Sequence, residues 1–267
     1  MRPLRALIFD VDGTLAETER DGHRRAFNAA FEELGLPWHW DAESYGPLLE
    51  ITGGKERLSH YARRNGFEPG GELDALVARL HRAKTRHFLA FLSCGGVGLR
   101  PGVARLLREA RASRLRLAIA TTTTPDNVTM LLDRTLGADA SRWFEVVGAG
   151  DVVAAKKPAP DIYQWVLQRM ELDPEHCIAI EDSAAGLRSA TAAGLATLVT
   201  HSHYTQQHDF GGALAVLDGL GEPDRPARGR VGEMPWRGVV DVDQIEVWAR
   251  TAPVGGQHRL TERDDAR

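Results

Sequence analysis

Two aspartates separated by one residue follow an apolar segment near the start of the chain, in the sequence LIFDVDGT at residues 7–14. Alternation along an extended strand places Asp10 and Asp12 on the same side, with Cα atoms roughly 6.6 Å apart. One carboxylate of such a pair can attack phosphorus and form an aspartyl-phosphate, while the other protonates the leaving alcohol and later deprotonates water. Because like charges repel at this spacing, we expect a divalent cation, and oxygen-only ligation suits Mg²⁺. An aspartate-rich turn after a strand is the structural alternative.

Short apolar segments of strand length recur along the chain, and most precede a helical pattern. They cover residues 4–9, 115–120, 144–147, 177–180 and 195–199. This order is typical of a parallel α/β sheet, whose ligands bind beyond the carboxyl ends of the strands. About ninety residues without a comparable strand separate the first two segments, too many for an ordinary βα crossover. The helical spacing of Phe27 with Phe31, and of Leu73 with Leu80, predicts a helical insertion there.

We therefore expect an α/β protein in which a helical cap domain is inserted after the first strand of a Rossmann-like parallel-sheet core. The expected core comprises residues 1–17 and 96–250, and the expected cap comprises residues 18–95. In residues 251–267 the only sizeable aliphatic side chains are those of Val254 and Leu260, so we expect a disordered tail.

The composition is that of an ordinary globular protein. Its 267 residues are 43% hydrophobic and 26% charged, with a net charge of −4, which argues against a nucleic-acid binder or a binder of anionic membranes. Cys94 and Cys177 match no zinc-ligand spacing and indicate no disulfide framework. No run approaches the roughly 20 apolar residues of a membrane span, and residues 4–9 are too short for a signal-peptide core. We expect a cytoplasmic protein.

The Asp-x-Asp segment resembles the first motif of the haloacid dehalogenase superfamily, and three later segments resemble its other motifs in the same order. Thr121 stands where the family's second motif binds the transferred phosphoryl group, and Thr122 beside it is expected to contact substrate. Without the resemblance, this threonine run would more often cap a helix. Lys157, which precedes Pro158, resembles the third motif, so its ammonium group is expected to offset the charges of nucleophile and phosphate.

The fourth motif resembles Glu181-Asp182 at the end of an apolar segment. The resemblance implies that Asp182 contacts Mg²⁺ together with Asp10 and Asp12, with Glu181 assisting in the metal shell. A helix N-terminus also favours paired acids, which is the alternative for this segment alone.

Within the superfamily, the insertion resembles that of the β-phosphoglucomutase-like branch and, in residues 16–28, 45–46, 52–57 and 80–85, that of CbbY-type phosphatases. Those enzymes are associated with the Calvin cycle and remove xylulose-1,5-bisphosphate, an inhibitor of Rubisco. A bisphosphate needs a second anion site, which basic side chains and close-approaching glycine backbone can supply. The expected substrate-binding residues of the insertion and its linker are Glu17, His23, Gly53, Gly54, Lys55, Arg57 and Lys84. The alternative for each is an ordinary solvated surface residue.

Two further patterns, a second Asp-x-Asp and a group of three histidines, resemble catalytic or metal sites but lack residues that such sites need. Asp241-Val242-Asp243 repeats the Asp-x-Asp spelling but lacks the Gly-Thr that follows Asp12, and we interpret it as a helix start. His201, His203 and His208 lack a completing carboxylate or cysteine, which indicates a surface loop rather than a metal site.

The leading hypothesis is a Mg²⁺-dependent phosphatase that hydrolyses a sugar bisphosphate, with xylulose-1,5-bisphosphate as the expected substrate. A phosphosugar mutase of the β-phosphoglucomutase type and a generic sugar-phosphate phosphatase are the alternatives, since all three need the same core and a cap. The expected partner is a small sugar phosphate, with neither nucleic acid nor membrane, and a monomer is the working hypothesis.

Overall fold

The computed structural model describes residues 3–251 and is built around one 8-stranded sheet, ordered β3-β2-β1-β4-β5-β6-β7-β8. The strands are β1 (Ala6–Phe9), β2 (Arg116–Ala120), β3 (Val146–Gly148), β4 (Cys177–Glu181), β5 (Ala196–Thr200), β6 (Ala215–Leu217), β7 (Ala227–Val231) and β8 (Met234–Gly238). Neighbours from β3 to β6 pair in parallel, whereas β7 is antiparallel to both β6 and β8. The predicted α/β fold with a mostly parallel sheet is confirmed, and the five expected segments correspond to β1–β5.

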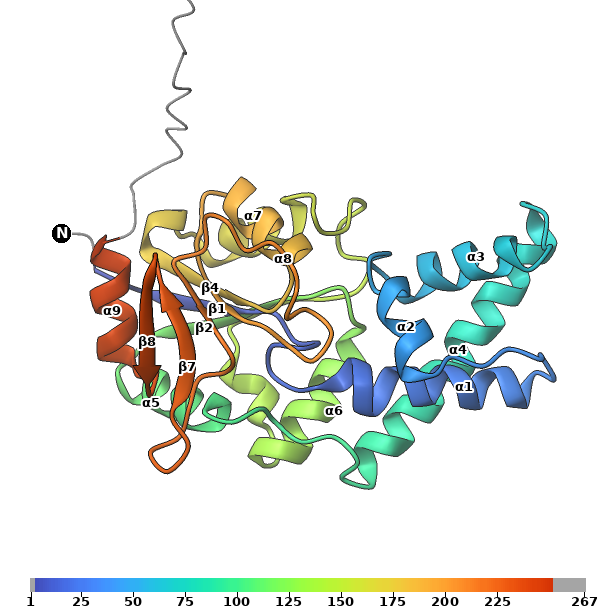
Figure 1. The fold of residues 1–267 in the computed structure, drawn as a ribbon, viewed down its shortest axis with the longest axis horizontal. Helices are drawn as coiled ribbons and strands as arrows, with labels where there is room; N and C mark the ends of the chain where they lie inside the picture. The colour runs from blue at the N-terminus through green and yellow to red at the C-terminus, as the bar shows by residue number, and fades with distance from the viewer. Residues whose placement is uncertain (1–2, 252–267) are drawn as a thin grey trace, which may run out of the picture.

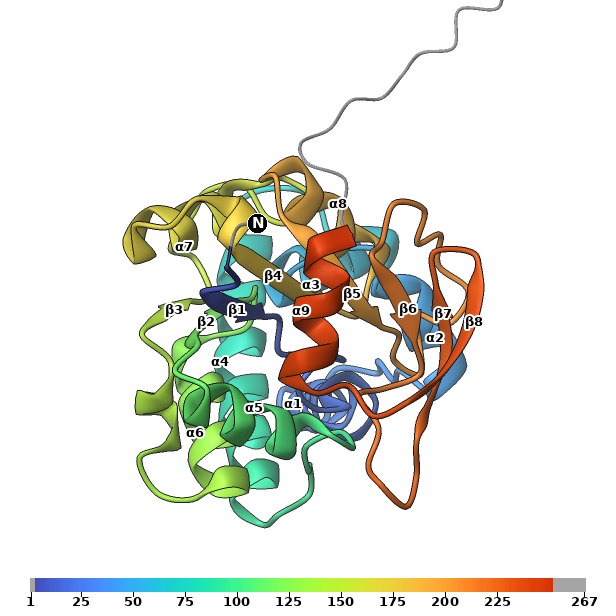
Figure 2. The same cartoon turned by 90° about the vertical axis from the view of Figure 1, so that its left-hand side faces the viewer.

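Helices fill the insertion between β1 and β2 and cover both faces of the sheet. The α-helices are α1 (Arg24–Glu33), α2 (Ala42–Leu48), α3 (Gly54–Arg64), α4 (Gly71–Ser93), α5 (Val103–Ala112), α6 (Pro125–Leu136), α7 (Asp161–Met170), α8 (Ala184–Ala192) and α9 (Val242–Thr251). Single turns of other helix types are η1 (Glu19–His23), η2 (Ala140–Trp143) and η3 (Pro174–His176). Helices α1–α4 gather at one end of the molecule (Figure 1), and α7 and α8 lie across the sheet from α5 and α6 (Figure 2).

Strand β1 shows why a four-residue segment can be apolar throughout. Leu7 and Phe9 face the cluster that includes α5, α6 and α9, whereas Ala6 and Ile8 face α7 and α8, and all four side chains are fully buried. A strand covered on both faces has no polar position. Because β1 lies between β2 and β4, the crevice beyond its carboxyl end is the switch point where ligands of such sheets bind. Asp10 is the first residue beyond that end.

The inserted helices have their own aromatic core, in which the Phe27 and Trp40 rings lie 4.8 Å apart between centroids. Asn28 fixes the backbone there, because its side chain bonds both the N–H and the carbonyl of Trp40 at 2.8 Å. The predicted helical spacing is confirmed in α1 and α4. The later part of α4, with Phe88 and Leu92, joins the main core and so fixes the helical unit to the sheet.

Two linkers connect the helical unit to the sheet, and they run side by side. Ala16 pairs with Leu99 in a β-bridge, and the Arg100 N–H donates to the Leu15 carbonyl at 2.8 Å. Helices η1 to α4 fall within residues 18–95, the expected cap. The division into core and cap at these boundaries stays a prediction.

The region after Leu217 contains more structure than its composition indicates. Its Gly-, Pro- and Arg-rich sequence gave no expectation of strands, yet it forms the hairpin β7–β8 at the edge of the sheet. The reason is that the hairpin lies at the edge of the sheet with little burial: Arg228 and Gly229 in β7 and Met234 and Pro235 in β8 are exposed, so no continuous apolar run appears. The helix start expected at 241–243 is confirmed, because the Asp241 carboxylate accepts from the Gln244 N–H at 2.7 Å.

Three other expectations concern the C-terminal tail, the two cysteines and membrane-spanning helices. The tail expected at 251–267 lies outside the described residues beyond Thr251, where α9 ends. Both cysteines are free, Cys94 exposed and Cys177 buried. Between residues 3 and 251, no helix combines the length and apolar character that a membrane crossing requires.

Candidate active site

Three carboxylates meet at the carboxyl ends of β1 and β4. The parallel register pairs Phe9 with Ile180, and the Asp10 N–H donates to the Ile180 carbonyl at 3.0 Å. The next residues, Asp10 and Glu181, therefore lie side by side, with Asp182 adjoining. One carboxylate oxygen from each of these three acids lies within 4.8 Å of the others, and all three residues are buried. Strand pairing thus brings together acids that are far apart in the sequence.

The Lys157 ammonium group is the cation of this cluster. Its Nζ lies 2.6 Å from Asp10 Oδ1 and 2.5 Å from Glu181 Oε1, and it also donates to the Ala120 carbonyl at 2.9 Å. The Tyr163 hydroxyl donates to the same Glu181 oxygen at 2.6 Å. Lys157 is followed by a cis peptide bond to Pro158. One cation and a phenol therefore orient two of the carboxylates.

One ammonium group does not balance three buried acids. Burial raises the pKa of Asp10 well above its ordinary value although the Lys157 charge opposes the rise. Burial and the neighbouring Glu181 charge raise the pKa of Asp182 to about 7. A divalent cation would relieve this repulsion, and the donors are all carboxylate oxygens, which suit Mg²⁺. The cluster of Asp10, Glu181 and Asp182 therefore fits a metal ion.

Asp12 is held differently from Asp10. Its Oδ1 accepts from the Thr18 hydroxyl at 2.5 Å and from His23 Nε2 at 2.9 Å. Burial opposes ionisation, but the His23 charge and these hydrogen bonds together lower the pKa of Asp12 to about 2. The carboxylate is thus directed toward the inserted helices, and among the described residues it is not part of the three-acid cluster. Its expected role as a metal ligand stays a prediction.

The threonines that follow β2 have different surroundings, because Thr121 is buried and Thr122 lines a cleft. Thr121 is buried, its N–H donates to the Gly148 carbonyl, and its hydroxyl accepts from the Thr123 N–H at 3.3 Å. Thr122 lines a cleft between the sheet and the inserted helices. Thr124 stands at the N-cap position of α6, without a capping side-chain bond. Helix α6 thus begins directly after the threonine run, and the phosphoryl-binding role of Thr121 stays a prediction.

The cleft has walls from both parts of the chain. The sheet side supplies Asp12, Thr122, Thr123, Thr124 and Asn127, and the helical side supplies Glu19, His23, Phe27, Gly53, Gly54, Arg57, His81 and Lys84. The helical wall thus carries Arg57 and Lys84 together with one acid, Glu19, whose carboxylate lies 3.6 Å from the Arg57 guanidinium.

A family model of haloacid dehalogenase-like hydrolases matches residues 4–194. The chain belongs to this family of hydrolases. The plasmid protein CbbY of Cupriavidus necator is 51% identical over 225 residues, 84% of this chain and 88% of that protein. A crystal structure of CbbY from Rhodobacter sphaeroides with phosphate has a TM-score of 0.76 at 47% identity, covering 81% of this chain and 94% of that one. Its D10N mutant in complex with xylulose-1,5-bisphosphate has a TM-score of 0.77 at 46% identity, with coverages of 83% and 98%. The resemblance to the haloacid dehalogenase superfamily and its CbbY group is confirmed.

In this haloacid dehalogenase-like hydrolase, the cleft is lined by Thr122 and by five of the seven insertion and linker residues expected to bind substrate. These five are His23, Gly53, Gly54, Arg57 and Lys84. Lys84 is buried, with Nζ 5.1 Å from the Phe27 ring centre and 5.2 Å from that of Phe88. Burial lowers the pKa of Lys84 to about 8. Arg57 is also buried and donates to the Tyr45 hydroxyl at 2.7 Å.

The structure places the other two expected residues elsewhere. Lys55 pairs with Asp151 at 2.7 Å, and both side chains are exposed beside a neighbouring hollow. Glu17 lies 3.5 Å from the Arg100 Nε and accepts weakly from the His203 N–H at 3.4 Å. Neither is among the residues that line the cleft. Their contact with substrate stays a prediction, which this arrangement does not support.

Several residues of the site escaped the sequence analysis. Tyr163 holds Glu181, but on α7 it occupies the same buried face as Ile162 and Val166, so it resembles a core aromatic. Glu19, which accepts from the Tyr45 hydroxyl at 2.5 Å, lies within the segment that resembles CbbY-type phosphatases, so closer attention to that segment would have found it.

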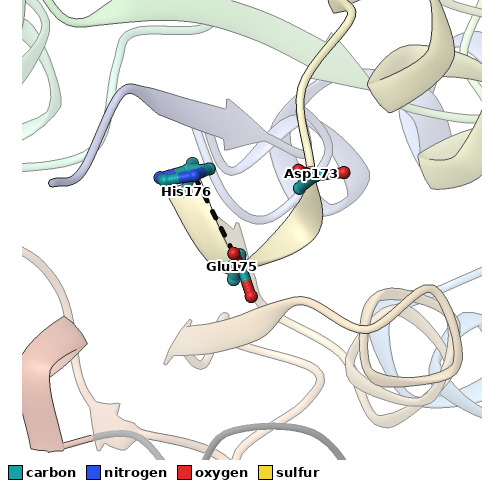
Figure 3. Close-up of side chains that lie close together, drawn as sticks. All are labelled: Asp173, Glu175 and His176. Atoms are coloured by element: carbon teal, nitrogen blue, oxygen red, sulfur yellow. Dashed lines mark ion pairs between the residues drawn. The ribbon is translucent and has the colours of Figure 1, made fainter. Parts of the chain in front are cut away.

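A second group of potential metal ligands lies at the other end of β4, in Asp173, Glu175 and His176 (Figure 3). His176 Nδ1 lies 3.0 Å from the Pro3 carbonyl, and its Nε2 is 3.9 Å from Glu175. Both acids are exposed, unlike the buried cluster at the carboxyl end of the sheet. The histidines at 201, 203 and 208 belong to neither group found in the described residues.

Proposed function

We propose that this enzyme is a Mg²⁺-dependent phosphatase that hydrolyses xylulose-1,5-bisphosphate and thereby removes an inhibitor of Rubisco. The observation that carries the proposal is the contrast across the cleft. Buried carboxylates and Lys157 lie at the sheet, whereas Arg57 and Lys84 lie in the opposite wall. A molecule with a phosphate at each end fits such a cleft. The similar CbbY protein of Rhodobacter sphaeroides has been crystallised with this bisphosphate.

Asp10 is the proposed nucleophile. Its Oδ1 accepts from Lys157, which leaves Oδ2 free to attack phosphorus. The new bond joins Oδ2 to phosphorus, the ester bond to the sugar oxygen breaks, and the leaving oxygen takes a proton. Lys157 and the Thr121 region stabilise the charge on the phosphoryl oxygens. Mg²⁺ bound by Asp10 and Asp182, with Glu181 close by, would offset the charges of phosphate and carboxylates.

Asp12 is the proposed proton carrier. In the free enzyme it is ionised at neutral pH, which suits the second half-reaction. There a water oxygen attacks phosphorus and gives its proton to Asp12, the bond between Asp10 Oδ2 and phosphorus breaks, and phosphate leaves with the Asp10 carboxylate restored. For the first half-reaction it must be protonated. A phosphate dianion placed beside the carboxylate raises the pKa of that carboxylate by charge repulsion, so substrate binding itself favours the acid form.

The distal phosphate is assigned to the helical wall. Gly53, whose φ is +100°, is the N-cap of α3 and lines the cleft with Gly54, and backbone N–H groups at a helix N-terminus bind anions. Arg57 and Lys84 add charge from the same wall. His23 lies between the two ends, where it can bond a sugar hydroxyl through Nδ1, which has no partner in the structure.

A phosphate-release panel tests the function. Xylulose-1,5-bisphosphate, ribulose-1,5-bisphosphate and several sugar monophosphates are each incubated with enzyme and Mg²⁺, with a chelator as the matched blank. A strong preference for the first compound supports the proposal, and equal rates on all of them would leave a generic phosphatase.

Two further arms complete the panel. β-Glucose 1-phosphate with a bisphosphate primer should yield free phosphate, whereas conversion to glucose 6-phosphate without phosphate release would identify a mutase. The Asp10→Asn variant removes the attacking oxygen's charge without changing its shape, so turnover should fall by at least about 10³-fold. The variant should stay folded, because Lys157 keeps its ion pair with Glu181. Near-normal hydrolysis by this variant would refute Asp10 as the nucleophile.

A further inference from the structure

Arg100 is a buried arginine that no motif explains. It lies directly after the second linker between helical unit and sheet, and it is 7% exposed. Its guanidinium donates to the carbonyls of four residues in three loops, Gly13, Thr200, His201 and Asp218. The bonds to Thr200 and His201 are both 2.7 Å long, and that to Asp218 is 3.1 Å. One side chain therefore joins the ends of β1, β5 and β6.

Two of these loops contact Asp182. Gly13 follows Asp12, and its Cα lies so close to Asp182 that an added Cβ would be 2.2 Å from Oδ2. The chain beyond Thr200 leads to Thr205, whose hydroxyl donates to the same oxygen of Asp182 at 3.4 Å. The carbonyls that Arg100 binds thus belong to the two segments between which this carboxylate is packed.

Backbone carbonyls supply most of the compensation for burying the Arg100 charge. Within the described residues, Glu17 is the one acid at ion-pair distance, 3.5 Å from Nε and partly exposed, while Asp182 and Asp218 act on Arg100 only at longer range. An apolar side chain in its place would leave these buried carbonyls without donors. A planar guanidinium, however, offers donors in fixed directions and so fixes the carbonyls relative to one another, which the single ammonium of lysine cannot do.

We propose that Arg100 is a positioning residue for the metal site, which holds the Gly13 loop and the loop after β5 in the arrangement that orients Asp182 toward Mg²⁺. This inference rests on the proposed function, because it assumes that the three-acid cluster binds Mg²⁺. Arg100 itself touches neither the metal nor the substrate; it acts through the backbone of residues 13 and 200–201.

The test compares Arg100→Met and Arg100→Lys with the wild type. Mg²⁺ binding is measured by titration calorimetry on the metal-free enzyme, and kcat and KM are measured at saturating Mg²⁺ for the bisphosphate. We expect at least tenfold weaker Mg²⁺ binding for Arg100→Met, a lower kcat, and a KM within about threefold of the wild type. Arg100→Lys should recover part of the Mg²⁺ affinity, because an ammonium can satisfy some of the carbonyls.

Arg105→Met is the matched control. Arg105 on α5 also donates to three backbone carbonyls, those of Leu220, Gly221 and Val240, but these connect α5 to the β6 and α9 region instead of to Asp182. Its loss should lower the melting temperature and leave Mg²⁺ affinity and kcat within twofold of the wild type. A comparable loss of Mg²⁺ affinity in Arg105→Met would show that general destabilisation is responsible and would overturn the proposal.

The remaining outcomes are also decisive. A folded Arg100→Met that binds Mg²⁺ and turns over within twofold of the wild type would overturn the proposal. If that variant fails to fold, Arg100→Lys decides in the same way. Mg²⁺ binding by a wild type that releases no phosphate would refute the proposed function while the comparison of affinities still tests Arg100. A wild type that binds no Mg²⁺ would overturn both.

Discussion

Replacing Lys157 with methionine tests the charge balance of the core directly. Its ammonium lies 2.6 Å from Asp10 and 2.5 Å from Glu181, and the side chains of all three are nearly inaccessible to water. Removing one partner of a buried ion pair costs about 3–5 kcal/mol, because the remaining charge is left without compensation. We expect Lys157→Met to lose that much unfolding free energy at pH 8 in the absence of Mg²⁺.

The same variant should be less damaged at low pH. Burial already raises the pKa of Asp10 in the presence of Lys157, and without it the carboxylates will hold a proton to still higher pH. The native state then binds more protons than the unfolded chain, so stability falls as pH rises between the unfolded and folded pKa values. Each retained proton changes the unfolding free energy by about 1.4 kcal/mol per pH unit. The loss at pH 5 should therefore be clearly smaller than at pH 8.

The assay is urea unfolding followed by circular dichroism at pH 5 and pH 8, with chelator and then with millimolar Mg²⁺. Lys156→Met is the control, since the partner of Lys156, Asp151, is exposed and such a pair contributes about 0–1 kcal/mol. Mg²⁺ should restore part of the stability of Lys157→Met at pH 8. An equal loss at both pH values, or a loss in Lys156→Met as large as in Lys157→Met, would refute the reasoning.

Two further predictions concern the cleft and the metal shell. The buried Lys84 has a pKa of about 8, so its charge is lost above that pH and kcat/KM for the bisphosphate should fall by up to about tenfold per pH unit. Lys84→Arg should remove this fall from the pH profile of kcat/KM. If the profile of the variant equals that of the wild type, Lys84 is not an anion ligand. An added Cβ at Gly186 would lie 1.9 Å from Glu181 Oε2, so Gly186→Ala should weaken Mg²⁺ binding and lower stability by about 1–3 kcal/mol. Gly71→Ala, where a Cβ meets nothing within 4 Å, should do neither, and calorimetry with thermal melting compares the two.

The core of the site was predictable because its signals are local. The first, second and fourth motifs are each an apolar strand followed at once by polar residues, and parallel pairing then places the ends of β1 and β4 together. Lys157 was expected to offset the nucleophile's charge, and it lies 2.6 Å from Asp10. What the local pattern could not give is the direction of a side chain after the strand ends. Asp12 shows this, because its partners Thr18 and His23 come from the linker and the inserted helices.

For the residues of the inserted helices, the sequence gives even less information about which side chains reach the cleft. Lys84 carried a usable signal, a charge that continues the apolar stripe of α4 after Val77 and Leu80, and it is buried in the cleft. Lys55 is also a lysine, but it lies on the exposed side of α3, where it forms an ion pair with Asp151. Arg100, between Leu99 and a proline, gave no signal, because its acceptors are backbone carbonyls that any sequence provides.

The distribution of charge explains why a core and a cap are both needed for a bisphosphate. The core cluster has three acids and one ammonium, so without a metal ion it repels an anion, and with one it accepts a single phosphate. It has no further cation for a second phosphate about a sugar's length away. Arg57 and Lys84 supply that charge from the opposite wall, where Arg57 lies 3.6 Å from Glu19 and Lys84 packs against the Phe27 and Phe88 rings. Variants at these two positions should therefore weaken the bisphosphate far more than a small monophosphate, which the core can bind alone.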